Sequence, residues 1–163
     1  MNDLVIPQDV AKAGGDDAAA EDAATQATYG ARTRWIEGAK FLGETASGHA
    51  LVMEGAAGDN LGVRPMELFL LGLGGCSAVD VVWLLRGMGE DVTDCDIRIE
   101  GKRATTHPQV FTHIHARYVV VGRGLNPMKV KLALKMSKDR LCSASAMLGK
   151  VAEMTHELEI KAA

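Results

Sequence analysis

The cysteines are the residues of this chain whose type and spacing are best suited to chemistry. Cys76 and Cys142 stand 66 positions apart, each in apolar, helix-like surroundings. Cys76 closes a glycine-rich apolar run that begins at Pro65, and Cys142 lies just before the predicted start of a helix. A thiolate is a strong nucleophile and condenses with a second oxidised sulfur, so two thiols placed in this way predict redox chemistry.

Helix position alone favours Cys142 as the reactive thiol of the pair. Unpaired N–H groups at a helix start, together with the nearby Lys138 and Arg140, favour a thiolate there. Cys76 is predicted in mid-helix, where burial should raise the pKa of its thiol, and Asp80 one turn further on disfavours its thiolate again. On composition alone, an ordinary buried residue is the favoured interpretation of each cysteine.

Three other residues that could take part in chemistry give weaker evidence for a functional site. Cys95 alternates with Ile97 and Ile99 in a strand-like run, which predicts an inert core thiol. His113 and His115 share a strand face with the spacing found in some zinc sites, but no third ligand stands at motif spacing. The sequence therefore predicts neither a bound metal nor a cofactor.

The elements that must position the cysteines follow from the hydrophobic pattern. A helix at 66–86 has Asp80 as its only charge between Leu68 and Leu85, which predicts the buried centre of a domain rather than a membrane span. Before it, alternation predicts two strands joined by a turn at 43–48. The two strands are clearest at 34–37 and 49–53. After the helix we predict two strands, two helices and a last strand, at 95–103, 111–122, 126–137, 143–152 and 156–160. The order ββ-α-ββ-α-α-β is an α+β arrangement.

Composition divides the chain into an extension and one domain. The first 27 residues carry six acids against one base and are rich in alanine, which is typical of a disordered, solvated segment. Residues 28–163 carry 17 bases and 15 acids, a balance that argues against nucleic-acid binding. The start of the chain does not have the pattern of a signal peptide, and an odd number of cysteines fits free thiols in a reducing cytoplasm.

Two cysteine motifs give the chain a resemblance to a known family. The run Pro65-Met-Glu-Leu-Phe-Leu-Leu-Gly-Leu-Gly-Gly-Cys76, followed by Asp80-Val-Val and later by Ser137 to Ser143, resembles the OsmC/Ohr family of thiol peroxidases over roughly residues 31–163. The segment 108–122 is most similar to the OsmC-like, YhfA-type branch. The resemblance implies an OsmC-like fold, with antiparallel sheets around a buried central helix, and an intertwined homodimer with active sites at the subunit interface.

The resemblance also implies roles for both thiols. Cys76 matches the peroxidatic cysteine, which attacks the O–O bond of an organic hydroperoxide and becomes a sulfenic acid. Cys142 matches the resolving cysteine, which forms a disulfide that a dithiol or lipoyl-type reductant reopens. This assignment reverses the one that helix position favours.

The chain departs from the family pattern next to Pro65. Better-characterised members have an acid directly after this proline, whereas here Met66 follows it and Glu67 comes one position later. Glu67 then lies half a turn around the helix from Cys76. Glu67 and Arg64, the arginine nearest in sequence, remain the candidate partners of Cys76, with Arg32, Arg34 and Arg140 as alternatives for the arginine.

Two functions compete on this sequence, and a purely structural interaction module is a third, weaker option. The leading one is a dimeric, cysteine-dependent reductase of organic hydroperoxides that uses Cys76 and Cys142 in oxidative stress defence. The alternative is a dimeric, non-enzymatic binding protein for a small hydrophobic or lipid-like ligand, with thiols that only sense oxidation. Turnover separates the two functions, because a binder consumes at most one oxidant per site.

Overall fold

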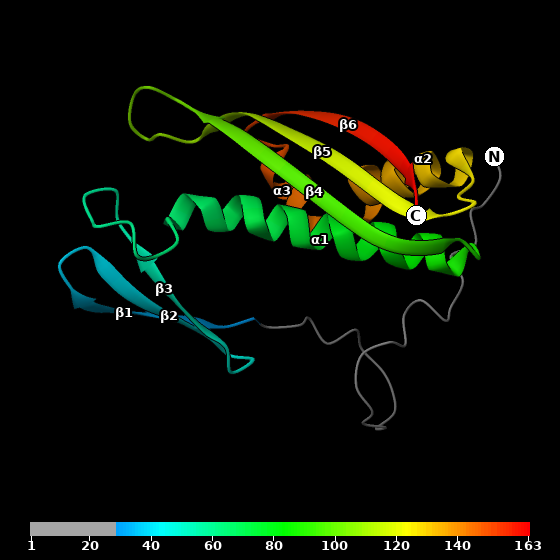
Figure 1. The fold of residues 1–163 in the computed structure, drawn as a ribbon. Helices are drawn as coiled ribbons and strands as arrows, with labels where there is room; N and C mark the ends of the chain where they lie inside the picture. The colour runs from blue at the N-terminus through cyan, green and yellow to red at the C-terminus, as the bar shows by residue number, and fades with distance from the viewer. Residues whose placement is uncertain (1–28) are drawn as a thin grey trace, which may run out of the picture. The chain divides into compact units, whose positions relative to one another are not determined.

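The computed structural model describes residues 29–163, so the predicted extension at 1–27 lies outside the described residues. The described chain forms two compact units, residues 29–69 and residues 70–163. Helix α1 (Pro65–Gly87) begins in the first unit and continues through the second (Figure 1).

The first unit contains a three-stranded antiparallel sheet of β1 (Ala31–Glu37), β2 (Lys40–Thr45) and β3 (Ala50–Glu54), in the order β1-β2-β3. The sequence predicted two strands before the helix, and the structure has three. Gly43, expected to open a turn, lies within β2 opposite Leu51. A Cβ at Gly43 would stand 3.0 Å from the Met53 Cε, so a glycine in mid-strand leaves room for that side chain.

A buried carboxylate fixes the loop that leads from β3 to α1. Glu54 is fully buried, and its two oxygens accept hydrogen bonds from the amide N–H groups of Asp59 (2.9 Å), Leu61 (2.6 Å) and Gly62 (3.2 Å). Three amide donors satisfy the charge that burial would otherwise penalise. Glu54 therefore determines the shape of the loop, a role that its position at the end of a strand pattern did not indicate.

The second unit contains β4 (Asp91–Arg103), β5 (Phe111–Arg123) and β6 (Glu153–Ala162), in the order β4-β5-β6. Strands β4 and β5 are antiparallel, as expected, but β6 runs parallel to β5, so this sheet is mixed. The reason is the helical crossover between β5 and β6, which returns the chain in the same direction. That crossover contains α2 (Pro127–Met136), one π-helical turn (Ser137–Leu141) and α3 (Ser143–Leu148).

The fold class is α+β, as predicted, with the order βββ-α-ββ-α-α-β. Helix α2 begins where the sequence places it, because the Asn126 side chain accepts a hydrogen bond from the Met128 N–H and Pro127 takes the first helical position. Helix α3 ends at Leu148, four residues earlier than predicted.

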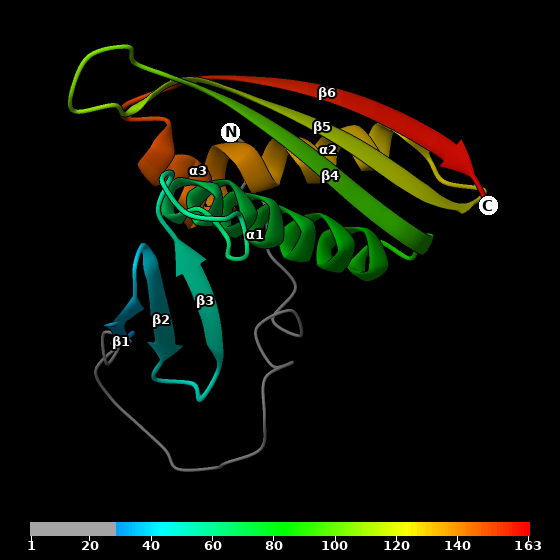
Figure 2. The same ribbon diagram turned by 60° about the vertical axis from the view of Figure 1, so that its left-hand side comes forward.

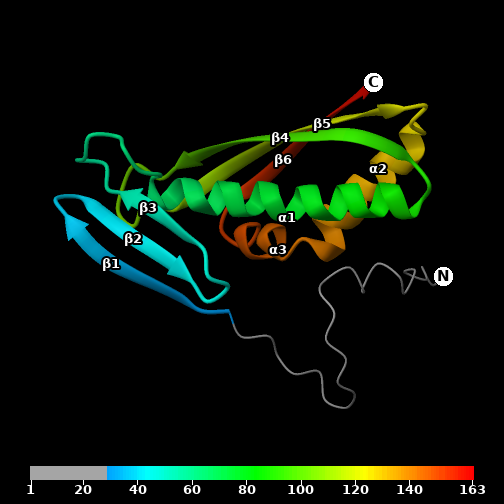
Figure 3. The ribbon, with the colours of Figure 1, turned by 60° about the horizontal axis from the view of Figure 1, so that its bottom comes forward.

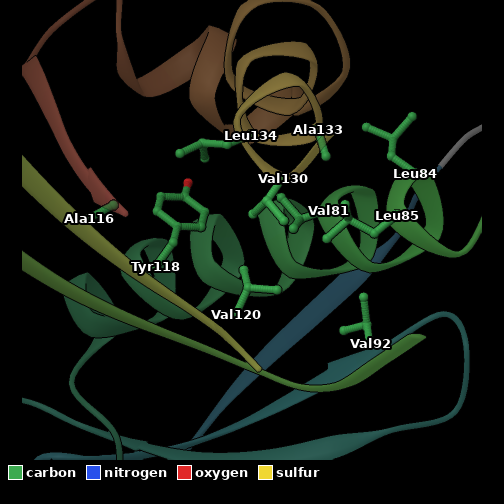
Figure 4. Packing of buried hydrophobic residues seen from close by; sticks show 10 residues of the cluster. All are labelled: Val81, Leu84, Leu85, Val92, Ala116, Tyr118, Val120, Val130, Ala133 and Leu134. Atoms are coloured by element: carbon green, nitrogen blue, oxygen red, sulfur yellow. The ribbon is translucent and has the colours of Figure 1, made fainter. Parts of the chain in front are cut away.

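Helices α1 and α2 cover one face of the β4-β5-β6 sheet (Figure 2). Apolar side chains from both helices and from the inner face of the sheet meet there in a continuous core (Figure 4). This core consists of Val81, Leu84, Leu85, Val92, Ala116, Tyr118, Val120, Val130, Ala133 and Leu134. The core holds α1 rigidly against the sheet, and with it the chemically interesting residues of the helix.

Within one chain, α1 buries a single face. Leu73, Ser77 and Val81 are buried, whereas Val79 and Trp83 remain 49% and 41% exposed. The helix is long and apolar enough to cross a bilayer by length and composition, a test that core helices of soluble proteins also pass. Packing of its buried face on the sheet favours the core role.

Candidate active site

Helices α1 and α3 bring Cys76 and Cys142 together. Cys76 lies in the middle of α1, and Cys142 is the residue that precedes α3, which lies beside α1 (Figure 3). Both are free thiols, and their sulfur atoms and a carboxylate oxygen of Asp80 all lie within 4.8 Å of one another. The two thiols are therefore close enough to form a disulfide after small movements of their side chains.

Cys142 occupies a buried pocket of hydrogen-bond donors. Its side chain is 2% exposed, and its Sγ accepts a hydrogen bond from the Ser77 hydroxyl and another from the Ser145 N–H, each at 3.4 Å. Burial by itself raises the pKa of the Cys142 thiol, but hydrogen bonds from Ser145 and Ser77 outweigh burial and lower that pKa. The geometry thus stabilises a thiolate on Cys142.

Cys76 has the opposite electrostatics. Burial raises the pKa of its thiol, and the adjacent Cys142 and Asp80 raise it further, against a hydrogen bond from the Ala144 backbone. Cys76 is nevertheless more accessible than Cys142. Of the two thiols, the buried Cys142 therefore loses its proton more readily than the more accessible Cys76.

Asp80 completes the group from the next turn of α1. Residues four apart share a helix face, so the Asp80 carboxylate points to the same side as Cys76. The Ser137 hydroxyl, fully buried at the start of the π-helical turn, donates a hydrogen bond to Asp80 Oδ2 at 3.0 Å. Burial raises the pKa of Asp80, while the Ser137 hydrogen bond lowers it. The net effect is that the pKa of the Asp80 carboxyl group is raised above its ordinary value.

The site roles of four residues were not predicted. Ser137 and Tyr118 were noted only as parts of their predicted elements and of the motifs that carry the family resemblance, and Ser77 and Ser145 were not noted. Tyr118 is 1% exposed, and burial raises the pKa of its hydroxyl against a hydrogen bond with Ser77. A tyrosine among the valines of β5 is the sequence signal that could have indicated a buried polar partner for the site.

Arg64 and Glu67 lie in the first compact unit, whereas the cysteine pair lies in the second. Glu67 Oε2 accepts the Arg64 backbone N–H at 2.9 Å, the return half of a capping box at the start of α1. The Arg64 guanidinium donates to the Gly55 carbonyl and, at 3.3 Å, to Asn60 Oδ1. Both residues thus make hydrogen bonds that stabilise the start of α1 and the loop before it.

The remaining candidates lie elsewhere in the second unit. Burial, with the charges of Asp94 and Asp96, raises the pKa of the Cys95 thiol to about 11. His113 and His115 lie on β5, and both rings contact the Thr155 hydroxyl, at 3.2 Å and 2.8 Å. These contacts give the two histidines a structural partner on the neighbouring strand.

The comparisons with known proteins agree with this fold. Residues 58–157 match the family model described as OsmC-like protein, and the chain belongs to this family. Protein YhfA of Escherichia coli (strain K12) is 43% identical over 133 residues, which span 82% of this chain and 98% of the relative.

Solved structures share the same architecture. A hypothetical protein from Aquifex aeolicus VF5 is 28% identical with a TM-score of 0.77, covering 85% of this chain and 99% of its own. The organic hydroperoxide resistance protein OhrB of Bacillus subtilis is 18% identical with a TM-score of 0.59, covering 81% and 98%. At that identity OhrB supports the fold alone.

Proposed function

We propose that this protein reduces organic hydroperoxides by cycling between two free thiols and a Cys76–Cys142 disulfide. The observation that carries this proposal is the meeting of both sulfur atoms and the Asp80 carboxylate within 4.8 Å at the junction of α1 and α3. A pair of thiols beside a proton-carrying group has what a peroxide reduction requires: a nucleophile, a resolving thiol and a proton source.

In the first step Cys76 attacks the peroxide. The Cys142 thiolate takes the proton of the Cys76 thiol, and the Cys76 sulfur attacks the outer oxygen of the hydroperoxide. The O–O bond breaks, and the leaving alkoxide takes the proton back from Cys142 and departs as an alcohol. Cys76 is then a sulfenic acid and Cys142 is again a thiolate. Accessibility and a more basic, more nucleophilic sulfur favour Cys76 for the attack.

In the second step Cys142 resolves the sulfenic acid. Its thiolate attacks the Cys76 sulfur, the S–O bond breaks, and a proton from the Asp80 carboxyl group converts the leaving hydroxide into water. An external dithiol, of the lipoyl type or a similar class, then reduces the disulfide to two thiols and is itself oxidised to a disulfide. Arg64 and Glu67 take positioning roles here, since they fix the loop and the first turn of α1.

Family names support the proposal without carrying it. Three structural neighbours are named organic hydroperoxide resistance proteins, and the name of YhfA states no activity. We further propose a homodimer, because a partner chain would cover the exposed apolar side of α1 around Val79 and Trp83. The cycle needs a reducing compartment such as the cytoplasm.

Turnover tests the proposal. Purified reduced protein should consume many equivalents of cumene hydroperoxide per chain when dihydrolipoamide is supplied, and Cys76→Ser should abolish consumption. Cys142→Ser removes both the proton acceptor and the resolver, so it should form a Cys76 sulfenic acid slowly, trapped with dimedone, and no disulfide. Cys95→Ser should retain activity as the matched control. Unchanged consumption in Cys76→Ser would refute the mechanism.

A groove on the second unit favours one alternative function. It has a volume of about 380 Å³ and runs between α1 and β4, where Val79, Val82 and Trp83 line one side and Cys95 the other. Arg86, Thr93 and Asp94 also line the groove, so it suits a small ligand that is partly hydrophobic and partly polar. For such a binder, hydroperoxide consumption stops at one equivalent per chain. The small ligand should displace a hydrophobic fluorophore from the wild type but not from Trp83→Ala.

A further inference from the structure

We propose that the reduced form of this protein binds one zinc ion through Cys76, Cys142 and Asp80. The three ligand atoms lie within 4.8 Å of one another. In a tetrahedral site with Zn–S bonds of about 2.3 Å and Zn–O bonds of about 2.0–2.2 Å, the ligand atoms would stand roughly 3.5 to 3.8 Å apart. Small side-chain movements bring the observed group to that spacing.

The backbone already holds the three ligands in one place. Cys76 and Asp80 are one turn apart on α1, a helix fixed by the core of the second unit. Cys142 is held at the start of α3 by the Ser145 N–H. A site whose ligands are already in place loses little conformational entropy when the metal binds.

The ligand types select the metal. Two soft thiolates exclude calcium and magnesium, which take oxygen ligands, and the carboxylate makes the set suitable for a borderline cation such as Zn²⁺. Three protein ligands leave the fourth position of the tetrahedron to water. Binding forms two Zn–S bonds and one Zn–O bond and displaces any proton still held by the thiols.

A shell of hydroxyl groups surrounds these ligands. The Ser137 hydroxyl donates to Asp80 Oδ2 at 3.0 Å, and the Ser77 hydroxyl donates to Cys142 Sγ at 3.4 Å. Outer-shell donors of this kind orient metal ligands. The Ser145 backbone N–H adds a further donor, at 3.4 Å from Cys142 Sγ.

The zinc site and the peroxide reaction are separable. Metal binding needs only the reduced thiols and the carboxylate, so it stands even if no hydroperoxide is turned over. Conversely, zinc would block the proposed reaction, because both sulfur lone pairs that the reaction uses would be engaged. Peroxide assays on chelator-treated protein therefore test one proposal, and metal assays test the other.

The experiment is a zinc titration of the reduced full chain in competition with a chromogenic chelator, with bound metal counted after gel filtration. We expect one zinc ion per chain, loss of binding in Cys76→Ser and Cys142→Ser, and at least tenfold weaker binding in Asp80→Asn. Ser137→Ala should weaken binding by roughly 10- to 100-fold, as outer-shell substitutions do. Cys95→Ser and the double substitution His113→Ala/His115→Ala should bind as the wild type does.

Equal zinc binding by the wild type and all variants, or loss only in the histidine variant, would overturn the proposal. A second measurement on the wild type covers the case of a variant that does not fold. Zinc should protect Cys76 and Cys142 from N-ethylmaleimide, read by peptide mass, and leave the alkylation of Cys95 unchanged. Alkylation of Cys76 and Cys142 at the same rate with and without zinc would also overturn it.

Discussion

At the scale of single residues, the chemistry of this protein depends on how one negative charge is shared between two sulfurs. Hydrogen bonds from Ser77 and Ser145 lower the pKa of the buried Cys142, while burial raises the pKa of Cys76. In the mechanism that we propose, the thiol with the lower pKa serves as proton acceptor and resolver, and the more accessible thiol attacks. This division agrees both with the family resemblance, which nominates Cys76 for attack, and with helix position, which predicts a thiolate on Cys142.

Substitution of Ser77 tests this charge sharing. Ser77→Ala removes the hydroxyl that donates to Cys142 Sγ, so the thiolate loses a stabilising partner. A hydrogen bond to a charged group contributes about 1.5–3 kcal/mol, so its loss should raise the pKa of Cys142. The pH dependence of ultraviolet thiolate absorbance in a Cys95→Ser background measures it.

Ser143→Ala is the matched control, because this exposed serine neighbours Cys142 in sequence and is not one of its hydrogen-bond donors. It should leave the titration unchanged. An unaltered titration in Ser77→Ala would mean that Ser77 does not stabilise the thiolate.

The roles of the two thiols illustrate what the sequence predicts at this scale. The resemblance identifies Cys76 and Cys142 as a pair, because the motif around each thiol is local in sequence. Ser137 and Tyr118 were not predicted, because their link to the thiols exists only after α2 and β5 pack on α1. The spacing of these residues along the chain does not predict such contacts.

At the scale of elements, the apolar patterns predict the long helix and strands well and the short pieces poorly. Helix α1 and strand β5 appear where periodicity places them, because each has a long pattern, and β4 begins at Asp91, four residues before the predicted strand. The strand β2 was missed, since its central Gly43 is typical of a turn. The parallel pairing of β6 with β5 follows from the crossover connection, which no local pattern within β6 specifies.

Loop 55–62 gives a prediction at this scale. Burial by itself raises the pKa of Glu54, but hydrogen bonds from the Leu61, Gly62 and Asp59 amides outweigh burial and lower that pKa. A depressed folded-state pKa means that the carboxylate contributes stability above its unfolded value, and that this contribution is lost as pH falls through the folded value. Hydrogen exchange of the Leu61 amide should therefore accelerate, relative to its intrinsic rate, below about pH 4.5.

Glu54→Gln should remove this pH dependence and leave the Leu61 amide poorly protected at neutral pH. Asp59→Asn serves as the control, because Asp59 contributes its backbone N–H rather than its side chain to the Glu54 hydrogen bonds. Equal protection of Leu61 in Glu54→Gln and the wild type would contradict the anchoring role of Glu54.

At the scale of the whole molecule, the exposed apolar side of α1 points to a second chain. Val79 and Trp83 are about half exposed on a helix whose opposite face packs in the core. Large apolar side chains grouped on one surface are typical of an interface. A dimer formed through this side would give α1 the burial on all sides that its composition predicts.

Light scattering in solution tests this assembly. The wild type should have twice the chain mass of 17.3 kDa, and Trp83→Glu should shift the population to the single-chain mass, because a carboxylate would be desolvated at the interface. Met128→Glu, which changes an exposed residue at the start of α2, should leave the dimer intact. A monomeric wild type at micromolar concentration would refute the proposed dimer.

The central claim is that Cys76 and Cys142 form a disulfide when they meet a hydroperoxide, and one measurement tests it directly. Reduced, chelator-treated protein is mixed with one equivalent of cumene hydroperoxide, and its intact mass and non-reducing peptide map are recorded over time. The account predicts rapid loss of two hydrogen atoms and a Cys76–Cys142 linked peptide pair, absent in Cys76→Ser and retained in Cys95→Ser. An unchanged mass, or slow oxidation confined to Cys95, would contradict it.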